Sequence, residues 1–239
     1  MGGAALAARG SRAEVGEGGV HRLAWPVLLA WLLLFAWAVP RAEPADPAAV
    51  LAAVTDRLVE EARRHAQDYR REPDRARSLA EDLLAPLVDF AGIARRVLGP
   101  HGRGAPPDQL DRFATEYRQF VVNTLASGFV EQIERVARYG QSVRFLPTRW
   151  ADEGRSAAVR GRVSVEGGLP LEVDFRVRQV GGLWKVYDVV VAGVSLVQAN
   201  QSAFARELES AGVEGLTARL SAHNRAVEQR ATGTRACCG

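Results

Sequence analysis

Two adjacent glycines, Gly181 and Gly182, separate two apolar runs, and no other feature constrains the fold of this chain as tightly. Glycines supply the positive φ values that a tight turn between antiparallel strands requires. Before the turn, residues 171–178 alternate between apolar and charged side chains, as in a strand with one face in water. After the turn, residues 183–191 are apolar at nearly every position beyond Tyr187. The pattern predicts a β-hairpin whose second strand is covered on both faces.

Apolar residues at three- and four-residue spacing predict helices in the part of the chain that precedes the hairpin. Asp89 is suited to cap the start of a short helix, and the Gly99-Pro100 pair is suited to end it. The longest helix carries a broad apolar stripe that includes three phenylalanines and a tyrosine. The expected helices cover about residues 47–69, 73–84, 90–98 and 108–139.

Two further strands are expected at residues 142–146 and 157–165, and a turn at Gly167-Gly168 joins the second of them to the hairpin. Four antiparallel strands that follow a block of helices indicate an α+β fold with helices on one face of the sheet. After the sheet, helical spacing returns on both sides of Gly212, which is expected to interrupt it.

The first forty residues differ in composition from the rest of the chain. Three arginines precede an apolar run at residues 23–39, which ends in the small-residue pattern that a signal peptidase recognises. We therefore expect a cleavable secretory signal, with the cut after Ala38 or Ala42. The alternative is an uncleaved anchor, although seventeen residues is near the lower limit for a membrane span. The expected organisation is a signal at 1–38, a linker at 39–46, a folded domain at 47–224 and a polar disordered tail at 225–239.

Charge and cysteine content argue against several kinds of protein. The 239 residues include 31 Lys+Arg and 28 Asp+Glu, and no dense basic run has aromatic residues between its charges. A nucleic-acid partner is therefore not expected. The two cysteines, Cys237 and Cys238, are adjacent near the end of the chain and close no loop that would stabilise the fold.

The sequence offers little for catalysis or for binding a metal. It contains no nucleophile elbow, zinc-protease helix, P-loop or dinucleotide-binding glycine fingerprint. The histidines that follow the expected signal, His65, His101 and His223, lie in separate predicted elements. We therefore expect no metal and no cofactor.

Four side chains leave an enzymatic alternative open. Asp188 and Tyr187, together with Asp89 and Tyr117, could line a cavity and move protons, as in cone-shaped α+β enzymes. The simpler interpretation is that Asp188 caps a turn or pairs with an arginine, and we expect no catalytic residue.

Several segments resemble signature segments of the MlaC family, also called the toluene-tolerance (Ttg2-type) family. The most specific is the run WKVYDVVVAGVSLV at residues 184–197, and the order and spacing of the segments agree over about residues 47–224. The chain departs from the family pattern at Gly102, where members often have tryptophan, and at Asn200-Gln201, where many have Tyr-Arg. The supporting segments are LAPLVDF at 84–90, VLG at 97–99, Gln109 followed by Phe113 and Phe120, and GVEGL at 212–216.

The resemblance implies an NTF2-like α+β fold, in which helices and a twisted antiparallel sheet of about four strands enclose an apolar cavity. It also implies a periplasmic carrier that holds the acyl chains of a phospholipid in that cavity. The implied partners are an outer-membrane lipoprotein complex and an inner-membrane ABC transporter complex with an MCE-domain ring, between which the lipid is shuttled. The alternatives are a hopanoid-associated carrier of the same family, an NTF2-like enzyme acting on a small apolar substrate, and a structural adaptor with a filled core.

A lipid cavity needs apolar walls that the protein itself does not fill. The aromatic stripe of the long helix and the apolar face of the hairpin are the candidates for these walls. Arg144 or Arg149 is expected at the mouth, where a guanidinium could meet the phosphate of the head group. The expected wall residues are Leu83, Leu87, Phe113, Tyr117, Phe120, Leu171, Val173, Phe175, Val177, Trp184, Val186 and Val189.

Overall fold

The computed structural model of the chain describes residues 46–140, 143–164 and 170–236. Residues 44–239 form a compact unit of their own, and the elements below belong to it. The expected signal, the linker as far as residue 45, the Gly167-Gly168 turn and both cysteines lie outside the described residues. In the part that is described, no helix is both long and apolar enough to span a membrane.

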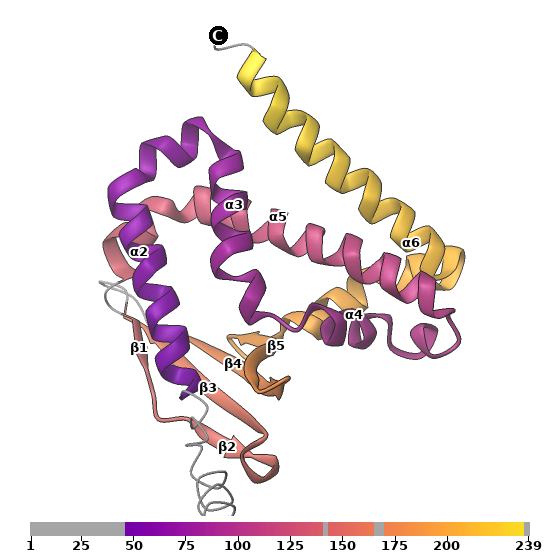
Figure 1. Cartoon of the computed structure of the whole chain (residues 1–239), viewed down its shortest axis with the longest axis horizontal. Coiled ribbons are helices and arrows are strands. Elements are labelled where there is room, and N and C mark those ends of the chain that lie inside the picture. The colour runs from indigo at the N-terminus through magenta and orange to yellow at the C-terminus, as the bar shows by residue number, and fades with distance from the viewer. Residues whose placement is uncertain (1–45, 141–142, 165–169, 237–239) are drawn as a thin grey trace, which may run out of the picture. The chain divides into compact units, whose positions relative to one another are not determined.

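The helices that precede the sheet agree with those expected from the apolar spacing (Figure 1). Asp46 caps α2 by accepting a hydrogen bond from the Ala48 amide at 3.1 Å. Asp89 caps α4 by accepting one from the Gly92 amide at 3.0 Å, which confirms its predicted role. The elements are α2 (Pro47–Arg71), α3 (Pro73–Leu83), the 3-10 turn η1 (Ala85–Leu87), α4 (Phe90–Leu98), the 3-10 turn η2 (Gly99–Arg103) and α5 (Pro107–Tyr139).

The described strands form one antiparallel sheet in the order β1-β3-β4-β5-β6, with β2 paired to the edge of β3. The hairpin expected at the two glycines is confirmed, because Gly181 and Gly182 have φ values of 59° and 80°. The short strands β2 and β6 were not predicted, since two or three residues are too few to show alternation. The strands are β1 (Val143–Phe145), β2 (Arg149–Ala151), β3 (Ser156–Val163), β4 (Leu171–Val180), β5 (Leu183–Val191) and β6 (Val194–Ser195).

The two faces of the sheet differ in chemistry, as the alternation in β4 predicts. Val159, Phe175 and Val189 are register partners in one row on the apolar face. On the outer face, Arg160 donates two hydrogen bonds to Asp174, at 2.6 and 2.8 Å. This guanidinium holds the pKa of the Asp174 carboxyl below its usual value. The apolar face is therefore the one on which a core can form.

The outer face of β5 is partly covered, which agrees with its continuous apolar sequence. A bulge shifts the register between Arg176 and Val177. Arg96 of α4 stacks over the ring of Tyr187 with 4.2 Å from its guanidinium carbon to the ring centroid. Arg178 donates from two guanidinium nitrogens to one carboxylate oxygen, Oδ2, of Asp89 at the start of the same helix. Helix α4 is therefore attached to the sheet by charged and aromatic contacts.

Helix α6 (Leu196–Ala236) follows the sheet and breaks at Gly212, as predicted, because this glycine has a φ of 67°. The second part continues to Ala236, so the tail that was expected to be disordered at 225–239 is helical as far as residue 236. Most residues between 225 and 236 are good or moderate helix formers, and polar composition alone does not indicate disorder.

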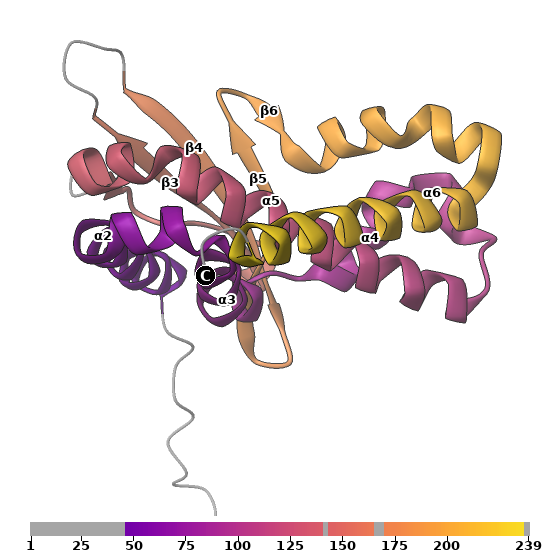
Figure 2. The same cartoon turned by 90° about the horizontal axis from the view of Figure 1, so that it is seen from above.

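The buried apolar residues form three separate clusters, and Figures 1 and 2 show the elements that contribute to them. Among helices, only α2 contributes buried residues to the sheet cluster within the described chain, whereas α5 contributes to the other two. The long helix therefore lies next to the sheet without sharing a core with it. The α4–α6 cluster is Ile93, Ala94, Val97, Leu98, Phe113, Tyr117, Phe204, Leu208, Val213, Leu216 and Leu220; the α2–α5 cluster is Ala62, Tyr69, Ala76, Ala80, Phe90, Val122, Ala126 and Ile133; the sheet cluster is Leu51, Ala157, Val159, Val177, Trp184 and Val186.

Candidate functional site

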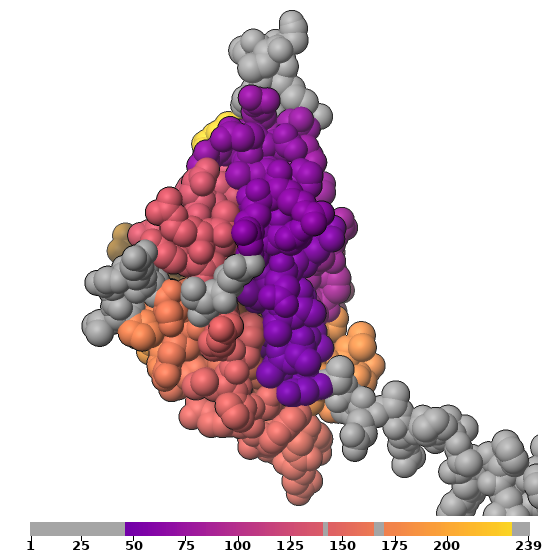
Figure 3. Space-filling view, turned by 90° about the vertical axis from the view of Figure 1, so that its left-hand side faces the viewer, coloured from indigo at the N-terminus to yellow at the C-terminus, as the bar shows by residue number. Residues whose placement is uncertain are grey.

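A cavity of about 430 Å³ lies where α2, the C-terminal end of α5 and three strands meet. Figure 3 shows α2 running along this face of the molecule beside the end of α5. The cavity occupies the region in which α5 passes the sheet without joining the sheet cluster. Its lining residues are Thr55, Leu58, Val59, Gln132, Arg135, Val136, Tyr139, Gly140, Val143, Val163 and Leu171.

The walls of the cavity are mostly aliphatic, and part of this apolar surface is not covered by protein. Val163 of β3 and Leu171 of β4 are register partners at one end of the sheet. Leu171 is 44% exposed, although it belongs to the face that is buried further along the strands. An aliphatic surface that is left open beside a packed core is typical of a site that an apolar ligand completes.

The rim of the cavity carries one cation and a few neutral polar groups. The Arg135 guanidinium donates a hydrogen bond to the Gln132 side chain at 3.3 Å. Among the described residues, no carboxylate lies within 4 Å of this guanidinium. The Thr55 hydroxyl donates to the Leu51 carbonyl of its own helix at 2.9 Å and is not aligned with a reactive group. The site can therefore hold an apolar molecule and one anionic group.

Gly140 holds the end of α5 close to α2. A Cβ added at this position would overlap the side chain of Val59, which also lines the cavity. We expect Gly140→Ala to lower the free energy of unfolding by about 1–3 kcal/mol, because the side chain of Val59 or the whole of α2 must move. Urea unfolding followed by circular dichroism measures the change. Gly128→Ala is the control, since an added Cβ there has open space, and an equal loss in both variants would contradict this role of Gly140.

The structure brings the predicted wall residues of the hairpin together on one face of the sheet. Leu171 lines the cavity, and Val173 is half-buried on the same face next to Gly161. The remaining hairpin residues lie further along this face, in or against the sheet cluster: Phe175, Val177, Trp184, Val186 and Val189.

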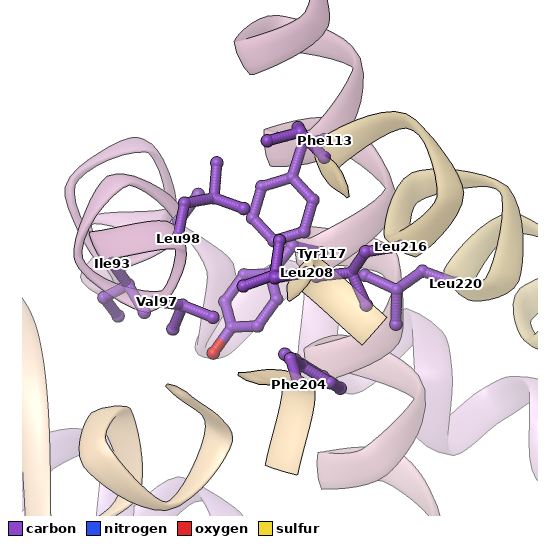
Figure 4. Packing of buried hydrophobic residues seen from close by; sticks show 11 residues of the cluster. Ile93, Val97, Leu98, Phe113, Tyr117, Phe204, Leu208, Leu216 and Leu220 are labelled. Atoms are coloured by element: carbon purple, nitrogen blue, oxygen red, sulfur yellow. The ribbon is translucent and has the colours of Figure 1, made fainter. Parts of the chain in front are cut away.

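The aromatic stripe of the long helix lies elsewhere. Phe113 and Tyr117 are fully buried in the α4–α6 cluster, and Phe120 packs against it. Figure 4 shows the first two rings enclosed by side chains of α4 and α6. Their rings stack with centroids 5.7 Å apart. On its α5 side the cavity is therefore lined by Gln132, Arg135, Val136 and Tyr139, near the C-terminal end of the helix, and not by this aromatic stripe.

Four other predicted site residues also lie away from the cavity. Leu83 and Leu87 are half-buried at the end of α3 and in η1. Arg144 pairs in register with Arg162, on the face opposite to that of Val143 and Val163. Arg149 approaches Asp174 of the same outer face, with 3.9 Å between the nearest nitrogen and oxygen. The cation at the cavity rim is instead Arg135.

Sequence reasoning missed most of the lining residues. Leu58 and Val136 belong to predicted apolar helix stripes, whereas Thr55, Gln132 and Arg135 lie on the polar flanks of these stripes. Helical spacing identifies an apolar face, but it does not show which neighbour that face meets. Only the relative position of α2 and the sheet reveals the opening.

Asp188, the residue on which the enzymatic alternative depended, has a structural role. It is buried and accepts hydrogen bonds from the Ser195 hydroxyl at 2.8 and 2.9 Å and from the Val197 amide at 3.3 Å. Arg176 pairs with it at 3.1 Å. These contacts fix the start of α6 to β5, as the simpler interpretation expected. Within the described ranges, no three His, Cys, Asp or Glu side chains gather as a metal site would require.

Tyr117 also has its polar group engaged, because its hydroxyl accepts a hydrogen bond from the Asn200 side chain at 2.8 Å. Burial, and secondarily the charge of Asp188, raise the pKa of Tyr117 to about 12. The raised pKa means that folding favours the neutral phenol. The resulting stability is present below pH 10 and is lost as the pH rises towards 12.

We therefore expect Tyr117→Phe to remove part of the alkaline destabilisation of this protein. The shift corresponds to about 3 kcal/mol between about pH 10 and pH 12. At neutral pH the variant should lose only about 1 kcal/mol, for the hydrogen bond to Asn200. Urea unfolding at neutral and alkaline pH measures both effects. Tyr69, whose pKa is also about 12, should account for a remaining slope, and an unchanged slope in Tyr117→Phe would contradict the prediction.

Comparison with known proteins identifies relatives over most of the chain. A family model described as MlaC protein matches residues 52–222. The toluene tolerance protein ttg2D of Pseudomonas putida is 24% identical over 164 residues, which are 68% of this chain and 73% of that protein. The intermembrane phospholipid transport system binding protein MlaC of Haemophilus influenzae is 20% identical over 177 residues, which are 73% of this chain and 80% of that protein.

A solved structure has the same fold. It is that of a phospholipid-binding protein from Ralstonia solanacearum in complex with a phospholipid, and it superposes with a TM-score of 0.65 at 22% identity. The match covers 77% of this chain and 99% of the other. The expected α+β architecture, an antiparallel sheet packed with helices, is confirmed by this similarity and by the strand pairing described above.

Proposed function

This chain belongs to the MlaC family, and on that premise we propose that it is a phospholipid carrier that holds acyl chains in the cavity between α2, α5 and the sheet. The observation that supports this most directly is the open aliphatic wall formed by Val163 and Leu171, beside a long helix that shares no core with the sheet. The phospholipid bound to the Ralstonia solanacearum protein of the same fold supports the choice of ligand.

The chemistry of the walls suits transfer as well as binding. Each buried CH₂ group is stabilised by about 0.8 kcal/mol relative to water, so a free diacyl lipid in solution is strongly disfavoured. A donor bilayer already shields the chains, and the cavity needs only to resemble hydrocarbon closely enough for lipid to enter and leave. Aliphatic side chains such as Leu58 and Val136 meet this need without directional bonds.

We place the head group at the rim, with Arg135 next to the phosphate. A guanidinium presents several donors in a plane that matches phosphate oxygens, and this one has no described carboxylate partner. The Gln132 amide and the Tyr139 hydroxyl also line the cavity and are available as secondary donors. This assignment replaces Arg144 and Arg149, which lie on the outer face of the sheet.

The carrier would act in the periplasm after removal of the segment at residues 1–38. It would shuttle lipid between an outer-membrane lipoprotein complex and an inner-membrane ABC transporter complex that carries an MCE-domain ring. The Haemophilus influenzae relative is named as the binding protein of an intermembrane phospholipid transport system, which supports this proposal. A carrier equilibrates between its partners, so the direction of transport would be set by them.

Lipid extraction tests the proposal. The protein is purified without detergent, extracted with organic solvent and examined by mass spectrometry, with phosphate determined per chain. We expect glycerophospholipid at close to one molecule per chain. A folded protein that contains no lipid and takes up none from vesicles would overturn the proposal, and turnover of a small apolar substrate would favour an enzyme instead.

A further inference from the structure

Large apolar side chains are exposed at the end of the sheet that lies opposite the cavity. Trp150 of β2 is 54% exposed and Leu183 of β5 is 62% exposed, and Val180 beside Leu183 is also exposed. Strand register places them at one end of the sheet, because β2 pairs with the first residues of β3, and these pair with the last residues of β4. Trp150 and Trp184 lie on the apolar face of this end and Val180 and Leu183 on its outer face, so the four flank the end of the sheet from both sides. We call Trp150, Val180, Leu183 and Trp184 the tip surface.

The tip surface is formed by two tight turns with fixed backbones. Gly181 and Gly182 turn the β4–β5 hairpin, and Asp152, Glu153 and Gly154 all have positive φ between β2 and β3. Positive φ at two consecutive residues other than glycine is uncommon and stores backbone strain, which is most often found at functional positions. Pairing with Ala157 of β3 holds Trp150 at the edge of the sheet, where its ring lies against Trp184 with centroids 5.5 Å apart.

Trp184 provides a second and independent observation. Its side chain is 92% buried, yet its indole N–H has no hydrogen-bond acceptor among the described residues. Buried donors are normally paired, so an unpaired indole N–H is unusual. The exposed ring of Trp150 lies against Trp184, and tryptophan is enriched where apolar and aqueous phases meet.

The chain also enters the fold at this end. Asp46, at the start of α2, accepts a hydrogen bond from Thr148 just before β2, at 2.8 Å. The apolar run at residues 23–39 ends seven residues before Asp46, and a chain of that length extends about 25 Å at most. Before any cleavage, a membrane that holds this run therefore lies within about 25 Å of Asp46, which contacts the residue before β2.

We propose that the tip surface docks on a lipid bilayer, with Trp150 and Leu183 entering the interfacial region. The contact is mainly apolar, because the exposed charges nearby almost balance: Arg149, Arg155 and Lys185 lie near Asp152 and Glu153. Bilayer binding through the tip surface leaves the cavity, at the other end of β3 and β4, directed away from the surface on which the protein rests. The proposal is independent of what the cavity carries.

Vesicle binding tests the proposal directly. The protein used is residues 44–239, which form a compact unit that contains all three core clusters. Its only tryptophans are Trp150 and Trp184, since the other three of the chain precede residue 44. We expect this protein to sediment with vesicles of phosphatidylcholine, its tryptophan emission to shift to shorter wavelength, and lipids brominated on their acyl chains to quench it. Adding phosphatidylglycerol should change the partition coefficient by no more than about threefold.

Variants separate apolar docking from other contacts. The double variant Trp150→Ala/Leu183→Glu should lower the partition coefficient by about tenfold or more. Leu125→Glu, which places the same charge at an exposed leucine in the middle of α5, should leave it unchanged. Circular dichroism shows whether each variant is folded. Quenching of the unmodified protein by brominated lipids tests insertion without any substitution.

Three results would overturn the proposal. The first is that the unmodified protein binds neither kind of vesicle, whether or not the tip surface is found to bind another protein. The second is that a folded double variant binds vesicles as tightly as the unmodified protein. The third is binding that requires phosphatidylglycerol and disappears in high salt, which would indicate electrostatic attraction without insertion.

Discussion

Replacing Asp188 with alanine should lower the free energy of unfolding by about 3 kcal/mol, because the carboxylate is buried and is the shared acceptor of several donors. Without it, the Ser195 hydroxyl and the Val197 amide lose their partner at the start of α6. Arg176 is half exposed and can turn to water, so most of the loss comes from the buried Ser195 hydroxyl and the half-buried Val197 amide and not from the arginine. Urea unfolding followed by circular dichroism measures the change.

Asp188→Asn distinguishes the structural role from the enzymatic one. The amide keeps the size of the side chain but removes its charge and replaces one acceptor oxygen with a donor, so it should also be destabilising, by about 1–3 kcal/mol. Asp174→Ala is the control and should cost clearly less than Asp188→Ala, because the Asp174 side chain is 22% exposed and that of Asp188 only 5%. If Asp188→Asn is as stable as the unmodified protein and loses a chemical activity, the capping role is wrong.

Replacing Val163 with glutamate should reduce co-purified lipid by about tenfold or more, because a carboxylate among acyl chains must be desolvated without a partner. Val163 lines the cavity beside Leu171, its register partner on the next strand, so the charge would lie in the wall and not at the rim. Lipid phosphate per chain after detergent-free purification measures the effect. Leu171→Glu should act in the same direction with less risk to folding, since Leu171 is already 44% exposed.

Ser164→Glu is the matched control for the cavity variant. It adds the same charge at the next residue, which is exposed and does not line the cavity, and it should retain lipid at the level of the unmodified protein. A folded Val163→Glu protein that still carries one lipid per chain would show that the acyl chains lie elsewhere.

Local sequence signals were sufficient to predict most elements of the fold. The glycine pair at 181–182, the cap at Asp89 and the break at Gly212 each depend on the geometry of one or two residues, and each is present in the structure. The strands β2 and β6 were missed because they exist only through pairing with longer neighbours. The helix at residues 225–236 was not expected, because the prediction gave more weight to polar composition than to helix propensity.

The candidate site could be predicted only in part, for a physical reason. An apolar stripe such as that of Phe113 and Tyr117 has the same sequence pattern whether it faces a cavity or a packed helix. Helix α6 covers this stripe, and nothing in α5 itself indicates that it should. The alternation of β4 did identify the correct face of the sheet, because a period of two leaves no other choice. The wall at Leu171 was therefore predicted, whereas the opposite wall on α2 was not.

The division of the interior into separate clusters has a consequence for melting. In the described chain, α2 is the one helix whose buried residues join both the sheet cluster and a helical cluster, so the two layers share few buried apolar contacts. An apolar ligand in the cavity contacts both the helices and the sheet, and it stabilises the packing of one layer on the other. The protein without ligand should then unfold on heating with reduced cooperativity, and its strands should unfold before its helices. The protein with bound ligand should unfold in a single transition at a higher temperature.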